Sequence, residues 1–379
     1  MKYDVIVAGG GPAGIGAAVA SARNGAKTLL IEASNARGGM GTNGLVPYIR
    51  TAGDNGGIIN EYWQRMVDEG VEMNGSAVSG VYVASKNGRS FFEASMFVDA
   101  TGDGNLFAWA DALFSKGRQE DGRLQAVSLN FQIGGIDREK LPPKEEFKAI
   151  VARAIQSGEL DMTEYTFRYL SMGAPAPGLP DNIHKYQFDF DFDTDASEAV
   201  SYSRGEIICQ QRVLQFWRFL KNQITGFENA ALVNLASSLG VRETRRIHGL
   251  EIMTAEDVMT GRKRPDGICR CSWYMDIHDE QDKIPLKEYC AARACPPGDY
   301  FEIPYGCLIS PCINNLLGAG RFISSTRAAN GAIRLQATCM NTGQAAGTAA
   351  AVCHNRKLKA QDLKGSELRT ILINQGIEI

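Results

Sequence analysis

Six consecutive positions, residues 9–14 (GGGPAG), constrain the fold more than any other part of the sequence. They stand between an apolar run at 3–8 (YDVIVA), which predicts a strand, and an alanine-rich stretch, which predicts a helix. The glycines match the spacing G-x-G-x-x-G: the first permits a tight turn, the second lets the backbone approach a pyrophosphate, and the third lets helix and strand pack closely. The free N–H groups and dipole of the helix N-terminus favour phosphate at this turn. The expected dinucleotide contacts are Gly9, Gly11, Pro12, Ala13 and Gly14.

A second apolar run, residues 28–31, ends in an acid that strengthens this prediction. Glu32 follows the glycines by about twenty residues, the spacing at which an acidic side chain accepts hydrogen bonds from a ribose. We expect Glu32, with the neighbouring Ala33, to bind that ribose. A glycine turn alone can be purely structural, but strand, turn, helix and acid-tipped strand together predict a Rossmann-type unit.

The segment after Glu32 indicates that the dinucleotide is FAD and not a nicotinamide cofactor. Nicotinamide domains usually continue into an ordinary helix, whereas residues 33–47 (ASNARGGMGTNGLVP) contain a glycine-rich turn. It resembles the turn that wraps the phosphate and ribityl chain of FAD in domains of the glutathione-reductase type, and residues 97–104 (FVDATGDG) resemble the Ala-Thr-Gly strand end of those domains. The resemblance implies FAD contacts from Arg37, Gly38, Gly39, Met40 and Thr42, and from Ala100, Thr101, Gly102 and Asp103.

The other end of the chain is expected to complete the same site. Residues 315–321 (NLLGAGR) predict a strand and a glycine turn, and residues 336–352 predict a helix rich in small side chains. This order resembles the closing segment of such flavoproteins, where the helix N-terminus points at the flavin and stabilises the charge of its reduced form. A tightly packed core helix is the alternative. The implied contacts are Ala319, Gly320, Arg321, Met340, Asn341, Thr342 and Gln344.

Together with residues 239–257, 265–279 and 303–307, these segments resemble the FAD-dependent oxidoreductases related to fumarate reductase and succinate dehydrogenase flavoproteins. The resemblance implies an α/β fold with a Rossmann-like FAD-binding domain, a parallel sheet with helices, assembled from residues 1–130 and 306–379. Part of 239–280 could belong to it. Residues 131–305 are expected to form an inserted α+β substrate or cap domain.

Two departures from that family concern the cofactor. Residues 37–45 contain no histidine, through which some relatives hold FAD covalently, so we expect non-covalent FAD. Residues 70–83 (GVEMNGSAVSGVYV) are short where the family usually has two strands and a turn near adenine, so an abbreviated or differently built adenine pocket is expected.

The middle of the chain predicts the elements of the cap. Residues 142–158 predict an amphipathic helix, residues 186–193 (YQFDFDFD) alternate at strand period, and residues 204–239 predict a long packing helix. The acids of the alternating run are expected on a solvated face, with a metal site as the less favoured alternative. These acids are Asp189, Asp191 and Asp193, and no metal is expected.

Candidate catalytic residues follow from the need to hold substrate over the flavin and to move a proton. Strand alternation over 242–248 (RETRRIH) would give one face with Arg242, Thr244, Arg246 and His248, and another with Glu243 and Arg245. Such an arginine face suits a carboxylate. The alternative is that Glu243 pairs with an arginine and that the other residues contact FAD phosphate or solvent.

Three further residues are candidates from their surroundings. His278 lies between carboxylates, which could fix its tautomer and tune it as an acid or base; a structural histidine is the alternative. Arg327 and Arg334 precede the final helix and could close the pocket from the flavin side.

The nine cysteines and the charge balance restrict partners and compartment. The cysteines show no C-x2-C spacing, so buried or inert thiols are favoured over an iron–sulfur cluster, a zinc site or a redox-active dithiol. With 40 basic and 43 acidic residues, the chain offers no footprint for nucleic acid or an anionic membrane. No leader or apolar span is visible, so a reducing, cytoplasmic location is expected.

Three functions stay open at this point. The first is an FAD-dependent dehydrogenase or reductase of a small, carboxylated organic substrate, with an electron-transfer protein as a further partner and a homo-oligomer as an option. The second is a monooxygenase, although its usual Gly-Asp-Ala segment is replaced by residues 318–321 (GAGR). The third is a flavoprotein with a non-redox modification or lyase step. No separate nicotinamide-binding unit is visible.

Overall fold

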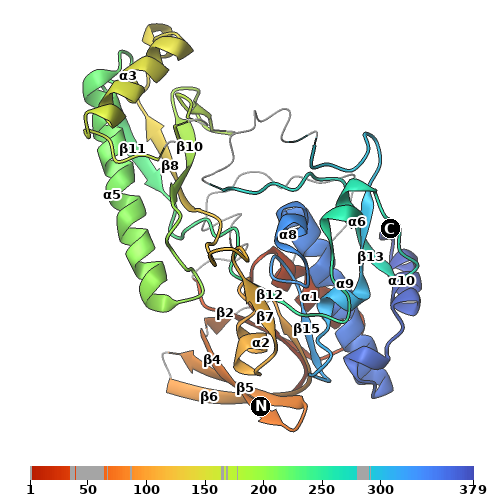
Figure 1. Ribbon diagram of the computed structural model, residues 1–379. Coiled ribbons are helices and arrows are strands. Elements are labelled where there is room, and N and C mark those ends of the chain that lie inside the picture. Colours follow the sequence, from red (N-terminus) through yellow and green to blue (C-terminus); the bar gives the residue numbers. More distant parts are fainter. Residues whose placement is uncertain are drawn as a thin grey trace.

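The computed structural model describes residues 2–34, 39, 64–65, 67–85, 88–163, 166–167, 170–176, 178–279, 290 and 292–379. The described strands form a larger sheet, a smaller four-stranded sheet and two strand pairs. Figure 1 shows the four-stranded sheet with α3 (Lys144–Gln156) and α5 (Ala199–Gln223) at upper left, apart from both chain ends.

The larger sheet takes strands from both ends of the chain. Its parallel strands lie in the order β3-β2-β1-β6-β15, and the C-terminal β15 pairs with β6 at Leu316 and Phe97. Both of these side chains are fully buried. The parallel strands are β1 (Lys2–Ala8), β2 (Thr28–Glu32), β3 (Gln64–Arg65), β6 (Gly88–Asp99) and β15 (Leu316–Gly318). The expected mixed α/β fold with a parallel sheet is therefore confirmed.

Two helices of small residues, α1 (Pro12–Arg23) and α9 (Gln336–Arg356), pack against each other near this sheet. Their backbones approach so closely that a Cβ added at Gly343 would lie 1.9 Å from the Ala13 carbonyl oxygen, and one at Gly347 would lie 2.0 Å from that of Ala17. The alanine and glycine content of both helices is thus required by their contact. The expected helix at 336–352 is confirmed.

The segment expected to be short for adenine binding forms two strands, β4 (Val67–Asn74) and β5 (Ala77–Ser85), antiparallel to each other and continued by β6. The turn between them is tight because Gly75 adopts a φ of 60°, a region that glycine enters without strain. Residues 67–85 therefore do form two strands and a turn, and the expectation that this segment is too short for them is corrected. The tight turn leaves enough residues for both strands.

The smaller sheet has the antiparallel order β11-β8-β10-β9. Apolar and polar side chains alternate along β8, and the apolar ones face α3 and α5. On that face Phe131 stacks on Tyr186 with ring centroids 5.0 Å apart. The strands are β8 (Val127–Gly134), β9 (Ala174–Pro175), β10 (His184–Asp191) and β11 (Ala231–Leu235). The expected strand near 186–193 and helix near 142–158 are confirmed.

Two expectations about the middle of the chain are corrected. The long helix expected at 204–239 ends at Gln223, because Gly226 turns the chain with a φ of 90° and β11 follows. Asp191 is buried and accepts a hydrogen bond from Thr194 instead of lying on a solvated face, whereas Asp193 is exposed and pairs with Arg123. The side chain of Asp189 lies outside the described residues.

The hydrophobic cores divide the chain differently from the expected boundary at residue 305. One core joins β8 and β10 with α3 and α5. Another joins α1 and α9 with apolar residues from 253 to 309, including Ile268 and Phe301 of the strand pair β13 (Gly267–Cys271) and β14 (Phe301–Pro304). Residues from 253 onward therefore share a core with the larger sheet.

Shorter elements connect these parts. They are α2 (Asn105–Trp109), β7 (Phe114–Lys116), β12 (Arg245–Ile247), α6 (Ala255–Met259), α8 (Arg327–Ile333) and α10 (Gly365–Asn374). Within the described residues, no helix combines the length and apolar character needed to cross a bilayer.

Candidate functional site

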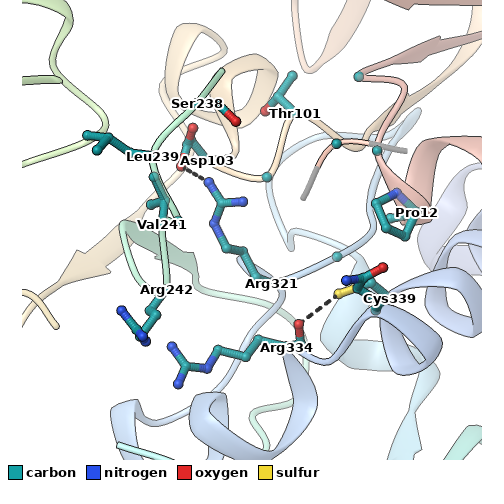
Figure 2. Close-up of a pocket in the computed structure, with 18 of the residues that line it drawn as sticks. Pro12, Thr101, Asp103, Ser238, Leu239, Val241, Arg242, Arg321, Arg334 and Cys339 are labelled. Atoms are coloured by element: carbon teal, nitrogen blue, oxygen red, sulfur yellow. Dashed lines mark hydrogen bonds and ion pairs between the residues drawn. The ribbon is translucent and has the colours of Figure 1, made fainter. Parts of the chain in front are cut away.

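A cavity of about 420 Å³ lies where the parallel sheet, α1, α9 and the smaller sheet meet. Its lining falls into two sets, one from the dinucleotide unit and one facing it, and Figure 2 shows part of both. The first set is Gly9, Gly11, Pro12, Ala13, Glu32, Ser34, Gly39, Ala100, Thr101, Gly102, Asp103, Gly320 and Arg321. The second is Ser128, Asn130, Gln187, Tyr202, residues 238–242, Asp276, Arg334, Leu335, Gln336 and Cys339.

Within the described residues, the glycine turn leaves room for a ligand at Gly11. A Cβ at Gly9, whose φ is 97°, would lie 2.3 Å from the Ala100 carbonyl oxygen, and one at Gly14 would lie 1.6 Å from the Gly9 oxygen. A Cβ at Gly11 would meet no atom of the described residues within 4 Å. Gly11 is also the N-cap of α1, which has no side-chain cap in the described part of the chain. The open space and the uncapped N–H groups together suit a phosphate.

Glu32 joins the glycine turn to the end of β2. Its carboxylate accepts a hydrogen bond from the Gly10 N–H and another, of 2.7 Å, from the Ser34 N–H. A carboxylate has about four lone-pair positions, so it can still accept ribose hydroxyls. Ala33 is exposed and does not line the cavity.

The turn after β6 is held by Asp99, which sequence reasoning missed. This fully buried carboxylate accepts hydrogen bonds from the Thr101 N–H (3.1 Å) and hydroxyl (2.8 Å), and from the N–H groups of Leu106 (2.8 Å) and Phe107 (3.2 Å) at the start of α2. Its signal was an acid inside an otherwise apolar strand end, FVDA.

Arg321 lies across this turn and ties the two ends of the chain together. Its guanidinium pairs with Asp103 at 2.5 Å, and Asp103 also accepts a 2.7 Å hydrogen bond from Thr244. Gly102 must be glycine here, because it has a φ of 84° and a Cβ would lie 2.5 Å from Arg321 Nη1. Figure 2 shows the Arg321 side chain running from its loop to Asp103.

Two of the residues predicted for the flavin wall line the cavity, together with the first turn of α9. Gly320 and Arg321 line the cavity, and so do Leu335, Gln336 and Cys339 at the N-terminus of α9. The other predicted wall residues do not line it. Ala319 is fully buried just after β15. The part of α9 that holds the remaining four packs against α1: a Cβ at Gly16 would lie 2.4 Å from the Met340 oxygen, and Thr342 is fully buried. The predicted wall residues that do not line the cavity are Ala319, Met340, Asn341, Thr342 and Gln344. The N-terminus of α9, which has no side-chain cap among the described residues, faces the cavity.

Of the predicted glycine-rich turn, only Gly39 is described, and it lines the cavity. Arg37, Gly38, Met40 and Thr42 lie outside the described residues.

Arg334 contacts Asp276, and Arg242 lies close enough to influence the charge of this carboxyl. Arg334 donates to the Asp276 carbonyl oxygen (2.6 Å) and lies 3.4 Å from its carboxylate, and Arg242 donates to the Ala126 oxygen (2.7 Å) and to Ser128 Oγ (3.3 Å). Figure 2 shows the two guanidinium groups directed to the same region. Burial opposes ionisation of Asp276, but the nearby His278, Arg334 and Arg242 outweigh it and lower the pKa of this carboxyl.

His278 contacts Asp276 instead of the cavity. Its Nε2 lies 3.2 Å from Asp276 Oδ1, and its backbone N–H donates to Gln125 Oε1 at 3.0 Å. His278 does not line the cavity.

The expected catalytic face over 242–248 is not formed. Only Arg245–Ile247 is a strand, paired with β7, so the alternation stops short of both ends. Arg246 is buried and pairs with Glu243, and His248 is exposed with its Nε2 2.7 Å from Ser115 Oγ. The predicted cavity positions of Arg246 and His248 are therefore corrected, because neither residue lines the cavity. Of the four residues of the expected face, Arg242 alone lines it.

Behind the cavity, Glu243 joins two arginines, as the alternative interpretation held. Besides Arg246, it accepts a 3.0 Å hydrogen bond from Arg327, which also makes two 2.8 Å contacts with Asp279. Arg327 is thus engaged in this network and does not line the cavity. Burial lowers the pKa of Arg246 despite the charge of Glu243.

The family model described as FAD dependent oxidoreductase matches residues 4–72 and 62–372. This chain belongs to that family. FAD is accordingly the cofactor of this oxidoreductase, and the glycine turn, the uncapped N-terminus of α1 and Glu32 fit its pyrophosphate and ribose. The narrower resemblance to fumarate reductase flavoproteins stays a prediction, because the family model is broader.

Several solved flavoenzyme structures are similar at a low level, whereas no curated protein matches the sequence. A geranylgeranyl bacteriochlorophyll reductase-like protein from Thermoplasma acidophilum is 14% identical, with a TM-score of 0.45, covering 100% of this chain and 84% of that one. The flavin-dependent brominase Bmp2 is 12% identical (TM-score 0.42; 99% and 83% covered), and the anhydrotetracycline hydroxylase OxyS from Streptomyces rimosus is 14% identical (TM-score 0.45; 99% and 67% covered). Likenesses this low do not choose among reduction, halogenation and hydroxylation.

Sequence reasoning missed the polar face of the smaller sheet that this oxidoreductase turns to its cavity. The signal was present in residues 127–134 (VSLNFQIG), which alternate apolar and polar side chains. Ser128 and Asn130 of β8 line the cavity, and Gln187 of β10 lies directly opposite Asn130.

The cysteines are free thiols and, except for Cys290 and Cys312, buried. Cys339 lines the cavity, and burial raises its pKa to about 12, so it is a neutral thiol near neutral pH. Among the described residues, no group of histidine, cysteine and acidic side chains could hold a metal ion.

Proposed function

We propose that this flavoprotein transfers hydride between a small, carboxylated organic substrate and non-covalent FAD. Bound FAD supplies the redox chemistry by accepting or donating hydride at N5 of its flavin ring. The observation that carries the proposal is the presence of Arg242 and Arg334 in the same cavity as the dinucleotide-binding residues.

The charge of this arginine pair supports an anionic substrate. Asp276 stays ionised, since its pKa is lowered, and neutralises one of the two positive charges. Planar guanidinium groups bind carboxylates with two parallel hydrogen bonds, so two arginines that line one cavity suit a substrate carboxylate. Because Arg334 is fixed by Asp276, and Arg242 by Ala126 and Ser128, little ordering is required when substrate binds.

The other candidate residues take different roles in this proposal. Asp276 positions Arg334, and His278 acts through its contact with Asp276. The reduced cofactor would pass its electrons to a further acceptor, and an electron-transfer protein is the partner we favour.

The test begins with the visible spectrum of the purified protein before and after acid precipitation, which should release FAD. Carboxylic acids are then added anaerobically without NAD(P)H. We expect one class of acid to bleach the flavin band. Bleaching only when NAD(P)H and oxygen are both supplied would identify a monooxygenase, and no bleaching by any acid in either direction would favour a non-redox role.

The arginine pair is tested with Arg242→Gln, and exposed Arg153→Gln on α3 is the matched control. Loss of a charge-assisted contact to the carboxylate should weaken binding of the bleaching acid about a hundredfold in the first variant. The control should bind normally. Equal binding by wild type and Arg242→Gln would contradict the proposed substrate site.

A further inference from the structure

Among the described residues, the cavity wall beyond the arginine pair is polar and uncharged. Gln187 extends from β10, Tyr202 from α5, and Ser238 from the segment that follows β11. This segment runs beside β8 and is held there by two backbone hydrogen bonds between Gly240 and Ser128, of 2.6 and 3.1 Å. All three side chains therefore belong to one wall built on the smaller sheet.

Three side chains on this wall have hydrogen-bonding capacity that no described residue satisfies. The Tyr202 hydroxyl accepts a 3.1 Å bond from the Leu239 N–H, so its own proton is available to donate, and it meets no acceptor among the described residues. The amide of Gln187 and the hydroxyl of Ser238 likewise make no hydrogen bond within the described part of the chain. Burial raises the pKa of Tyr202, which keeps this donor protonated at neutral pH.

We propose that Gln187, Tyr202 and Ser238 form an uncharged subsite for hydroxyl or carbonyl oxygens, so that the substrate is a hydroxy or oxo carboxylic acid. This inference rests on the proposed function and specifies its substrate class. A second carboxylate would need a second cationic partner, but the nearest arginine on this side, Arg321, is paired with Asp103. A plain aliphatic chain would leave all three groups unsatisfied, at the cost of their hydration.

The structure predicts how affinity should depend on the ligand. FAD-loaded protein is titrated by calorimetry with hexanoate and with gluconate, which has the same chain length and a hydroxyl on every remaining carbon. Butanoate and the positional isomers of hydroxybutanoate form a second, shorter series. In wild type we expect at least one hydroxy acid to bind about tenfold more tightly than its unsubstituted counterpart, the effect of one well-made hydrogen bond.

Two variants assign that preference to the wall. Gln187→Leu and Tyr202→Phe should lose it while keeping the affinity for the unsubstituted acid, and Tyr82→Phe, in the distant strand β5, is the control that should keep both. Gln187 is exposed to the cavity, so its replacement should not disturb folding, and the FAD spectrum of each variant verifies this.

The outcomes separate the two proposals. Equal binding of hydroxylated and unsubstituted acids by wild type would overturn the subsite and leave the carboxylate site standing. An equal loss of affinity for both acids in Gln187→Leu would also overturn it. Binding of no acid by protein with a normal FAD spectrum would overturn the carboxylate site, and this inference with it.

Discussion

At the scale of single residues, neighbouring glycines of one turn have separable roles. A Cβ at Gly14 would collide with the Gly9 oxygen, whereas a Cβ at Gly11 would project into open space where phosphate is expected. We therefore expect Gly11→Ala to leave the apoprotein as stable as wild type while weakening FAD binding at least tenfold. Thermal unfolding of the apoprotein and FAD titration by fluorescence measure the two effects.

Gly14→Ala provides the contrast. Overpacking of backbone against backbone should lower the free energy of unfolding by about 1–3 kcal/mol and reduce FAD binding as well. If Gly11→Ala destabilised the apoprotein as much as Gly14→Ala, the separation of roles would be wrong.

Asp276 makes stability depend on pH in a defined direction. Its folded-state pKa is below that of the unfolded chain, so its ionised form stabilises the fold above the unfolded value of about 4, and this contribution is lost as pH falls further. The Asp276→Asn variant has no carboxylate at this position, so it does not lose this contribution at low pH. We expect the stability difference between wild type and Asp276→Asn to shrink between pH 7 and pH 3.

Denaturant unfolding of both proteins at several pH values measures that difference. A difference that stayed constant, or grew, on acidification would show that Asp276 is not held ionised by Arg334 and His278.

At the scale of elements, the contact of α1 with α9 sets the shape of the cavity. Gly343→Ala would place a methyl group 1.9 Å from the Ala13 oxygen, so the helices must separate. We expect a loss of about 1–3 kcal/mol in unfolding free energy. Gly11→Ala, the same chemical change in open space, is the matched control, and an unchanged midpoint in Gly343→Ala would contradict the close packing.

Elements defined by short-range patterns could be predicted from the sequence, and those defined by pairing could not. The unit from β1 to Glu32 has its glycines, helix and acid in one continuous stretch. The roles of Arg246 and His248 depended on the extent of β12, which is fixed by β7, a partner far away in the sequence. Likewise, which face of α9 lines the cavity depends on how α1 packs, and the sequence alone does not show that Cys339 lies there and Met340 does not.

At the scale of the whole molecule, cofactor and stability should be linked, because the cavity joins residues from the larger sheet, α9 and the smaller sheet. A ligand that binds only the folded state stabilises it by RT ln(1 + [L]/Kd), about 2.7 kcal/mol at a hundredfold excess over Kd. We expect the melting temperature of the acid-stripped, refolded protein to rise steadily with added FAD.

ADP is the control ligand for that measurement. It can occupy the pyrophosphate and ribose positions near Gly11 and Glu32 but cannot bridge to α9, so it should bind more weakly and raise the melting temperature less than FAD at equal concentration. Identical shifts would argue against a flavin position between α9 and the smaller sheet.

The pairing of β15 with β6 has a consequence for synthesis of the protein. Phe97 gains its partner Leu316, and α1 gains the glycines of α9, only after synthesis has passed residue 347. Until then, nascent chains expose the apolar edge of β6 and the small-residue face of α1, a state in which chains aggregate readily. We expect a chaperone that shields this half-built sheet to raise the yield of folded protein.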